Sequence, residues 1–321
     1  YPAHGHLAHL AAVPAAAWVV ADAGSGAVLA ARDPHGWYPP ASTLKVLTAV
    51  ALMRVLSPGR MLPASRRAAG AVPSKVGLVA GHSYRVSDLF RALLLVSAND
   101  AAVALDQGTG SYRRGMALIN AEARHLRAGD TVAKRPNGLD APGQHVSAYD
   151  EALFARAALA MPWFMRIERL RTARFPLTRR RTVTLVNQNT MLRTFPGDLG
   201  GKIGWTSPAK ATFTGWARRG GHTLVVTVLH ATPGTELRTA AKLLSWGFQA
   251  DGKVRPVGRL VSPLPAAARQ SRGEPGRRAA IRPLPTSLAG RIAAGTAGFA
   301  AALLLGGWGT IVLRRRRAAS G

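Results

Sequence analysis

A hydroxyl and an amine stand one helical turn apart in the sequence Pro39-Pro40-Ala41-Ser42-Thr43-Leu44-Lys45. The two prolines disfavour helix before Ala41. The run Thr43–Leu56 has no glycine or proline and repeats its apolar residues at helical spacing, which predicts a buried helix. Ser42 and Lys45 then emerge on one face of that helix. A lysine can take the proton of a serine nucleophile only where burial or nearby positive charge lowers its pKa.

The alternative is that Ser42 caps the helix and Lys45 is an ordinary solvated lysine. The same spacing recurs at Ser207-Pro208-Ala209-Lys210, where a proline follows the serine and no long apolar helix follows the lysine. The chain has 43 lysines and arginines, of which 7 are lysines. Because arginine cannot deprotonate to act as a base, a lysine at position 45 of such a chain favours the catalytic interpretation.

The composition predicts a globular and strongly basic protein. Its 321 residues, 47% of them apolar, are enough for one large or two modest domains. The absence of cysteine excludes disulfides and thiolate metal sites. The net charge of +28 favours polyanionic partners. Nucleic acid is not expected among them, because the arginines are scattered through apolar segments and no nucleic-acid-binding motif is present.

The first residues carry a possible metal-binding pattern. His4, His6 and His9 are spaced closely enough to share a metal, but a frayed terminus is the favoured interpretation, and no metal or cofactor is expected. The chain begins at Tyr1 and not at methionine, so we expect a fragment or a processed form. Residues 1–16 are predicted to be a flexible segment.

Alternating apolar residues and turn signals predict an antiparallel sheet made from two hairpins. One joins Trp18–Val20 to Val28–Ala30, and the other joins Thr212–Trp216 to His222–His230. Further helices are predicted at residues 89–95, 101–105, 116–126, 147–161 and 235–248, with a strand at 182–186 and loops over 57–85.

The predicted catalytic domain covers residues 17–252, and the chain changes character after it. Residues 253–290 are rich in proline and arginine, which predicts an extended linker. Ile292–Leu313 carries no charge, so 291–313 is predicted to be a transmembrane helix, with a buried hairpin as the alternative. The arginine run that opens 314–321 predicts a basic cytoplasmic tail. We therefore expect a single-pass cell-membrane protein with an extracellular catalytic domain.

Three short motifs follow one another along the chain: Ser42-x-x-Lys45, Ser97-x-Asn99 and Lys202-x-Gly204. A second Lys-x-Gly, at Lys75, comes before the Ser-x-Asn motif and outside any strand-like run. With this order of motifs the chain resembles the serine-type D-alanyl-D-alanine carboxypeptidases, the low-molecular-mass penicillin-binding proteins, over residues 17–248. The resemblance lies in the stretches 39–45, 93–100, Asn137-Gly138-Leu139-Asp140, Ser147-Ala148-Tyr149-Asp150, Asn187-Gln188-Asn189 and 201–206.

The resemblance implies a β-lactamase/transpeptidase-like fold, an α/β arrangement in which helices flank an antiparallel sheet and a helical subdomain is inserted. It also implies peptidoglycan stem peptides ending in D-Ala-D-Ala as substrates. Ser42 would attack the carbonyl between the two D-alanines while Lys45 takes its proton, and Ser97 would pass a proton to the leaving D-alanine. Water would then hydrolyse the acyl-enzyme, and β-lactam antibiotics would be trapped on the serine.

The resemblance implies a substrate-binding set as well. Asn99 would hold the substrate amide. Lys202 would place a fixed positive charge near the Ser-x-Asn motif, where it keeps the base neutral and attracts the terminal carboxylate. The backbone N–H groups of the nucleophile and of Trp205 would bind the oxyanion. Thr206, which follows directly, is predicted to contact the substrate.

The third motif departs from the family at Ile203, where a threonine is usual and its hydroxyl helps to bind the substrate carboxylate. Thr206 or an arginine such as Arg218 could compensate. We therefore expect a weaker or altered enzyme, and the alternative is a membrane-tethered muropeptide-binding protein with little or no turnover. A class A β-lactamase is not expected, because the chain has no Glu-x-x-Leu-Asn element to activate a deacylating water.

Overall fold

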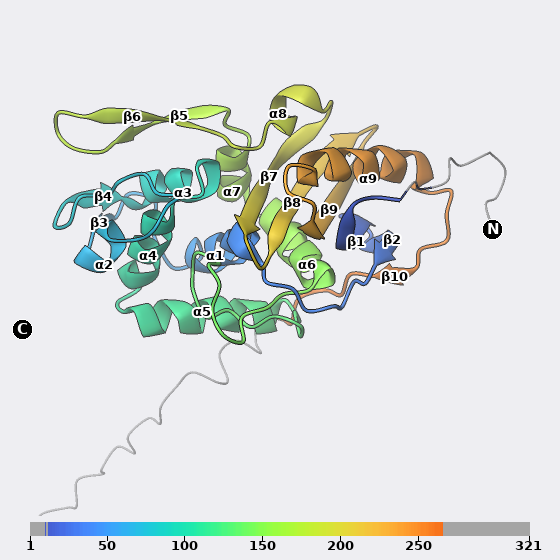
Figure 1. The fold of residues 1–321 in the computed structure, drawn as a ribbon, viewed down its shortest axis with the longest axis horizontal. Coiled ribbons are helices and arrows are strands. Elements are labelled where there is room, and N and C mark those ends of the chain that lie inside the picture. Colours follow the sequence, from blue (N-terminus) through green and yellow to red (C-terminus); the bar gives the residue numbers. More distant parts are fainter. Residues whose placement is uncertain (1–9, 11, 266–321) are drawn as a thin grey trace, which may run out of the picture. The chain divides into compact units, whose positions relative to one another are not determined.

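The computed structural model describes residue 10 and residues 12–265, and one six-stranded antiparallel sheet lies at its centre (Figure 1). The strand order is β10-β2-β1-β9-β8-β7. Both predicted hairpins are confirmed, and pairing between β1 and β9 joins them into one sheet. The strands are β1 (Ala15–Asp22), β2 (Ala27–Arg32), β7 (Asp198–Thr206), β8 (Lys210–Arg219), β9 (His222–Ala231) and β10 (Gly258–Arg259). The third sequence motif therefore lies on an edge strand, β7.

Helices cover both faces of this sheet. Successive side chains of a strand point to opposite faces, and accordingly Val19 belongs to one buried apolar cluster and Val20 to another. Helix α9 (Glu236–Ala250) packs on the face of Val20. Helix α6 (Ala148–Leu159) packs on the other face, as Figure 1 shows for α6 and α9, and α1 (Lys45–Leu52) packs against α6 in the same apolar cluster. The result is a layer of sheet between two layers of helix.

A helical subdomain is inserted between β2 and β7. Every residue of α1 is buried, which is the property of a helix that is surrounded by other elements. The remaining elements are a 3₁₀ turn (Ala41–Leu44), α2 (Arg66–Ala69), α3 (Val86–Leu95), α4 (Asn99–Gly108), α5 (Tyr112–His125), α7 (Pro162–Glu168), α8 (Met191–Thr194), and two short hairpins, β3 (Met61–Pro63) with β4 (Ser83–Arg85) and β5 (Thr172–Pro176) with β6 (Thr182–Val186). The 3₁₀ turn that leads into α1 contacts β7 and β8, so the start of α1 lies at the boundary between this subdomain and the sheet.

The helix predicted over Thr43–Leu56 is shorter and begins differently. Ala41 has a positive φ of 49°, a 3₁₀ turn follows, and α1 ends at Leu52. The helix ends where the chain comes to the surface, since Val55 is 50% exposed. The predicted loops at 57–85 contain short elements, α2, β3 and β4, that are too small for a periodic pattern.

The linker predicted to begin at residue 253 does not begin there. Strand β10 pairs with β2, and the buried Leu260 donates its backbone N–H to the Gly26 carbonyl (2.7 Å). The Tyr149 hydroxyl donates to the Arg259 carbonyl (2.8 Å) and accepts from the Val261 N–H (3.0 Å). The free edge of β2 provides these partners, and composition alone does not reveal such an edge.

The N-terminal histidines, the end of the predicted linker, the helix predicted over 291–313 and the tail 314–321 lie outside the described residues. Among the residues that the structure does describe, no helix is long and apolar enough to cross a membrane.

Candidate active site

The Ser-x-x-Lys motif forms a direct hydrogen-bonded pair. Ser42 lies in the 3₁₀ turn that leads into α1, and Lys45 is the first residue of α1. The Lys45 Nζ and Ser42 Oγ atoms are 2.7 Å apart. Lys45 is completely buried, whereas Ser42 is half-buried and lines a cleft. The hydroxyl is therefore accessible to a substrate, and the amine reaches it from the protein interior.

Two further acceptors fix the orientation of the Lys45 amine. Its Nζ atom lies 2.8 Å from the Asn99 side-chain oxygen and 2.8 Å from the Asn137 backbone oxygen. A neutral amine has two N–H donors and one lone pair. Because the two fixed acceptors use both donors, the lone pair of a neutral Lys45 faces the Ser42 hydroxyl. This arrangement suits a base that removes the serine proton.

The surroundings of Lys45 favour its neutral form. Burial lowers the pKa of Lys45 well below its usual value, the positive charge of Lys202 lowers it further, and the charge of Asp100 acts in the opposite direction. The Asp100 carboxylate itself accepts the backbone N–H groups of Gly77 and Leu78 at 2.8 and 2.9 Å. Asp100 therefore holds the loop of Gly77 and Leu78 beside the second motif. Among the described residues, no carboxylate is hydrogen-bonded to Lys45.

The Asn137 carbonyl is a part of the site for which the motifs gave no role. Its position depends on Gly138, whose φ is +78° and whose Cβ, if it had one, would lie 1.8 Å from the Ala41 backbone oxygen. A glycine is therefore required for the chain to pass this close to the turn that carries Ser42. The sequence shows the Asn-Gly pair, but it does not show that the backbone carbonyl of Asn137 accepts a hydrogen bond, because any residue has such a carbonyl.

The Ser-x-Asn motif lies at the junction of α3 and α4. Ser97 has a φ of +60°, which is unfavourable for a residue with a side chain and costs about 1–3 kcal/mol. This conformation lets the chain turn between the helices while Ser97 and Asn99 both line the cleft. The Asn99 side-chain N–H donates to the Val72 carbonyl (3.0 Å), which leaves its oxygen directed at Lys45.

Lys202, on β7, is the second buried lysine of the site, and the buried Glu168 at the end of α7 lies close enough for its charge to act on it. Burial lowers the pKa of Lys202, and the nearby charge of Glu168 raises it. The Glu168 carboxylate also accepts the Gly201 N–H at 2.9 Å. The Lys202 ammonium donates to the Ile203 carbonyl (2.7 Å) and, among the described residues, not to Ser97. Glu168 therefore favours the charged form of Lys202, which in turn disfavours a second charge on Lys45.

Strand β7 forms one wall of the cleft, which has a volume of about 460 Å³. A Cβ at Gly204 would lie 2.6 Å from the Ser42 backbone nitrogen, so the strand passes directly beside the nucleophile. Backbone groups of alternate residues point to the same edge of a strand. Trp205 therefore presents its N–H at the same edge as the Ile203 carbonyl that Lys202 binds. The indole of Trp205 is 60% exposed.

Of the two residues predicted to compensate for the missing threonine hydroxyl, Thr206 lies in the cleft and Arg218 does not. Thr206 lines the cleft, but its hydroxyl donates to the Asp140 carboxylate (2.9 Å) and accepts from the Ala209 N–H (3.1 Å). Arg218 lies near the other end of β8 and lines a different cavity, so the suggestion that Arg218 compensates is wrong. Ile203 is half-buried and lines the cleft between Lys202 and Trp205.

Comparison with known proteins agrees with this geometry. The family model for D-alanyl-D-alanine carboxypeptidases, peptidase family S11, matches residues 5–233. The chain belongs to the D-alanyl-D-alanine carboxypeptidase family. Its family membership and its mixed α/β fold were both predicted from the sequence and are confirmed.

Several members of the D-alanyl-D-alanine carboxypeptidase family are clearly similar. DacB2 of Mycobacterium tuberculosis is 40% identical over 241 residues, which are 73% of this chain and 82% of that protein. DacD of Salmonella typhimurium is 34% identical over 255 residues, which are 74% of this chain and 64% of that longer protein. A crystal structure of a D-alanyl-D-alanine carboxypeptidase from M. tuberculosis superposes with a TM-score of 0.74 at 38% identity, over 82% of this chain and 99% of that one.

The charge of Glu168 near Lys202 predicts a pH effect in this carboxypeptidase family member. Glu168→Gln keeps an oxygen for the Gly201 N–H but removes the charge that raises the pKa of Lys202. Activity that needs a charged Lys202 falls as pH rises through its pKa, so the alkaline limb of kcat/KM should move to lower pH in the variant. Rates of D-alanine release across a pH series would measure the shift. If the alkaline limb of kcat/KM does not move in the variant, Glu168 does not keep Lys202 charged. A loss of thermal stability alone would lower activity without moving this limb.

Proposed function

We propose that this chain is a serine carboxypeptidase that removes the terminal D-alanine from peptidoglycan stem peptides ending in D-Ala-D-Ala. The main support is the geometry of Lys45, whose Nζ atom lies 2.7 Å from Ser42 Oγ and is held by two other acceptors. Membership of the D-alanyl-D-alanine carboxypeptidase family supports the choice of substrate.

Acylation begins when Ser42 Oγ attacks the carbonyl carbon between the two D-alanines and its proton passes to Lys45 Nζ. The carbonyl oxygen becomes an oxyanion, which the backbone N–H groups of Ser42 and Trp205 stabilise; such a donor is worth about 10²–10³ in rate. The C–N bond then breaks, and the leaving nitrogen receives a proton through Ser97. Free D-alanine departs, and the remaining peptide is an ester of Ser42.

Deacylation uses the same groups with water as the nucleophile. Lys45, neutral again once its proton has passed through Ser97 to the leaving amine, accepts a proton from the water that attacks the ester carbonyl. The ester C–O bond breaks and Ser42 Oγ is reprotonated. The peptide leaves with a new terminal carboxylate. Both half-reactions require Lys45 to be neutral at their start, which is the state that its burial and the charge of Lys202 favour.

The substrate carboxylate is proposed to lie near Lys202 and the exposed edge of β7. A threonine at position 203 would add a hydroxyl there. Ile203→Thr should therefore lower KM for a D-Ala-D-Ala peptide by about tenfold, the value of one hydrogen bond to a charged group, with little change in kcat. Ile203→Val, which shortens the side chain without adding a hydroxyl, is the matched control. An unchanged KM in the threonine variant, or an equal fall in the valine variant, would mean that the carboxylate binds elsewhere.

We also propose that β-lactams acylate Ser42, because they present a carbonyl and a carboxylate as the D-Ala-D-Ala terminus does. The proposed location is the outer face of the cell membrane, with residues 291–313 as the anchor and the tail 314–321 in the cytoplasm. The charge-free segment and the arginines that follow it support this orientation.

The test of the function is release of D-alanine from a pentapeptide ending in D-Ala-D-Ala, with the same peptide ending in L-Ala-L-Ala as the matched control. We expect steady release from the first peptide and none from the second. Covalent labelling by penicillin without D-alanine release would instead favour a muropeptide-binding protein. Ile203 is the feature that supports that second candidate.

A further inference from the structure

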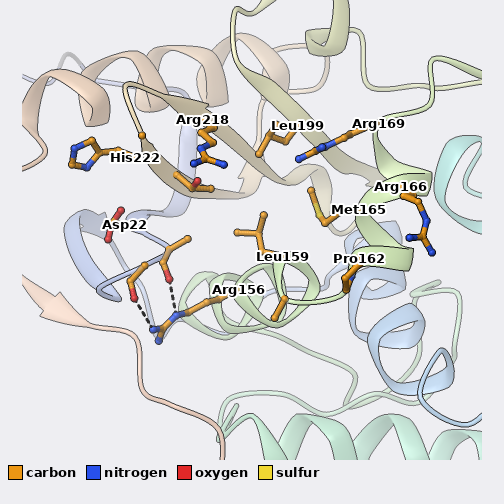
Figure 2. A pocket seen from close by; sticks show the side chains of 15 residues that line it. Asp22, Arg156, Leu159, Pro162, Met165, Arg166, Arg169, Leu199, Arg218 and His222 are labelled. Atoms are coloured by element: carbon orange, nitrogen blue, oxygen red, sulfur yellow. Dashed lines mark hydrogen bonds between the residues drawn. The ribbon is translucent and has the colours of Figure 1, made fainter.

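Figure 2 shows a large cavity whose lining residues differ from those of the catalytic cleft. It has a volume of about 880 Å³, within the range of small-molecule binding sites. Its walls come from α6, α7 and the ends of β7, β8 and β9 that are remote from Ser42. No described residue lines both this cavity and the cleft. Occupation of the cavity would therefore leave the catalytic groups free.

Arginines dominate the polar part of this cavity. Arg166 lies on α7 and Arg169 directly follows its last residue, one turn later, and Arg218 projects from β8 on the same side of the cavity in Figure 2. All three are exposed, and none forms an ion pair with a described residue. Arg156 lies opposite, where its guanidinium donates to the Ala23 carbonyl (2.9 Å) and to two other backbone carbonyls. Four positive charges thus surround one space, and three of them have free donors.

Negative charge at the cavity is small. Asp22 is the one acidic side chain among its lining residues, and its carboxylate accepts from the Ser25 N–H and hydroxyl, both at 2.7 Å. The His222 ring is directed at Asp251 (2.8 Å). Among the described residues, neither Asp22 nor Asp251 forms an ion pair with one of the three guanidinium groups. Like charges held around one space repel one another, and a bound anion relieves that repulsion.

The space between the arginines is apolar. Leu159, Met165 and Leu199 lie between the guanidinium groups in Figure 2. A single inorganic anion would fill a small part of the cavity and would leave these side chains uncovered. A ligand with several acidic groups joined by a carbon skeleton would satisfy both kinds of surface. Guanidinium groups match phosphate and carboxylate oxygens in pairs, which makes these the acidic groups to expect.

We propose that this cavity binds a segment of an anionic polymer whose phosphate or carboxylate groups are joined by short carbon units. Arg166, Arg169 and Arg218 bind the acidic groups, and the three apolar side chains pack against the carbon units. The ligand occupies a surface separate from the catalytic cleft, so it holds the domain near such a polymer and does not enter the reaction. The assignment does not depend on which peptide Ser42 cleaves.

The test measures binding of a short poly(glycerol phosphate) chain to the full chain by calorimetry, with poly-L-glutamate and inorganic phosphate as companions. The triple variant Arg166→Gln, Arg169→Gln, Arg218→Gln should weaken binding of the polymer by about a hundredfold, since three solvent-screened charge contacts, each worth about fivefold, are lost. Comparison of the two polymers identifies phosphate or carboxylate as the preferred group. Inorganic phosphate should bind far more weakly than either.

The matched control changes three exposed arginines at the tip of the β5–β6 hairpin, Arg179→Gln, Arg180→Gln and Arg181→Gln, and so removes the same charge. It should retain the affinity of the unmodified protein. An equal loss in the control would show general charge attraction and would overturn the site. Binding of phosphatidylglycerol vesicles that depends on Arg166, Arg169 and Arg218, without binding of either polymer, would overturn it in favour of a lipid surface.

Discussion

Replacement of Ser42 by alanine should abolish D-alanine release, with a fall in kcat of about 10⁶, because the nucleophile and the base act as one unit. The Ser42 Oγ atom lies 2.7 Å from the buried Lys45 amine, and it forms the ester in acylation and leaves from it in deacylation. Covalent labelling by penicillin should disappear as well. Mass spectrometry of the penicillin-treated protein, together with the rate of D-alanine release, measures both effects.

The chain provides a control for this substitution. Ser207 also stands three residues before a lysine and lines the same cleft, but Lys210 is exposed and points to no buried partner in the described chain. Ser207→Ala should retain covalent labelling. If Ser42→Ala were still labelled, or if Ser207→Ala lost its label, the nucleophile would have been assigned to the wrong motif.

These two serines show what could be predicted from the sequence. Both motifs have the same spacing, and the difference between them was the long apolar run after Lys45. That run is the buried helix α1, and its burial is also what lowers the pKa of the lysine. The apolar run thus predicted the catalytic lysine, because a helix that is buried on all sides also buries the amine of Lys45. The two hairpins of the sheet were predictable for the same reason, because apolar residues at alternate positions indicate which face of a strand is buried.

Other parts of the site could not be predicted, because they depend on backbone groups or on strand register. The Asn137 carbonyl lies 92 residues after Lys45 in the chain and carries no side-chain signal. Arg218 was a reasonable substitute for a missing hydroxyl until the register was known. Lys202 pairs with Thr214 on β8, so Arg218 lies four residues further along, or about 13 Å away. Glu168 is a lone glutamate near the end of a short helix, and nothing in the sequence connected it to Lys202.

The backbone around the site is strained at the two turns that carry the hydroxyl groups. Ala41, directly before the nucleophile, and Ser97 both have positive φ values, 49° and 60°. Each costs about 1–3 kcal/mol and is retained because buried neighbours fix the turn. Gly138 packs against Ala41, and the loop held by Asp100 packs over Ser97 and Asn99. The positions of the two hydroxyls are therefore set by tertiary packing and not by local preference.

Substitution of Lys45 by arginine should be nearly as damaging as substitution by alanine, although it keeps a positive charge. A guanidinium does not deprotonate, so it cannot accept the Ser42 proton, and a general base is worth about 10²–10⁴ in rate. It is also planar, whereas the Lys45 amine lies 2.7–2.8 Å from three oxygen atoms that surround it. The rate of acylation by penicillin in a single turnover is the measurement, because it isolates proton removal from Ser42 from later steps.

The pH dependence distinguishes loss of the base from loss of structure. In the unmodified protein acylation requires a neutral Lys45, so its rate falls as pH drops through the pKa of that lysine. Since burial and Lys202 lower this pKa, the limb lies well below the range of an ordinary lysine. The arginine variant should be slow at every pH and show no such limb, while Lys210→Arg, at the exposed lysine, should keep the normal profile. Substantial acylation by the arginine variant would refute Lys45 as the base and leave a positive charge beside Ser42 as all that the reaction needs.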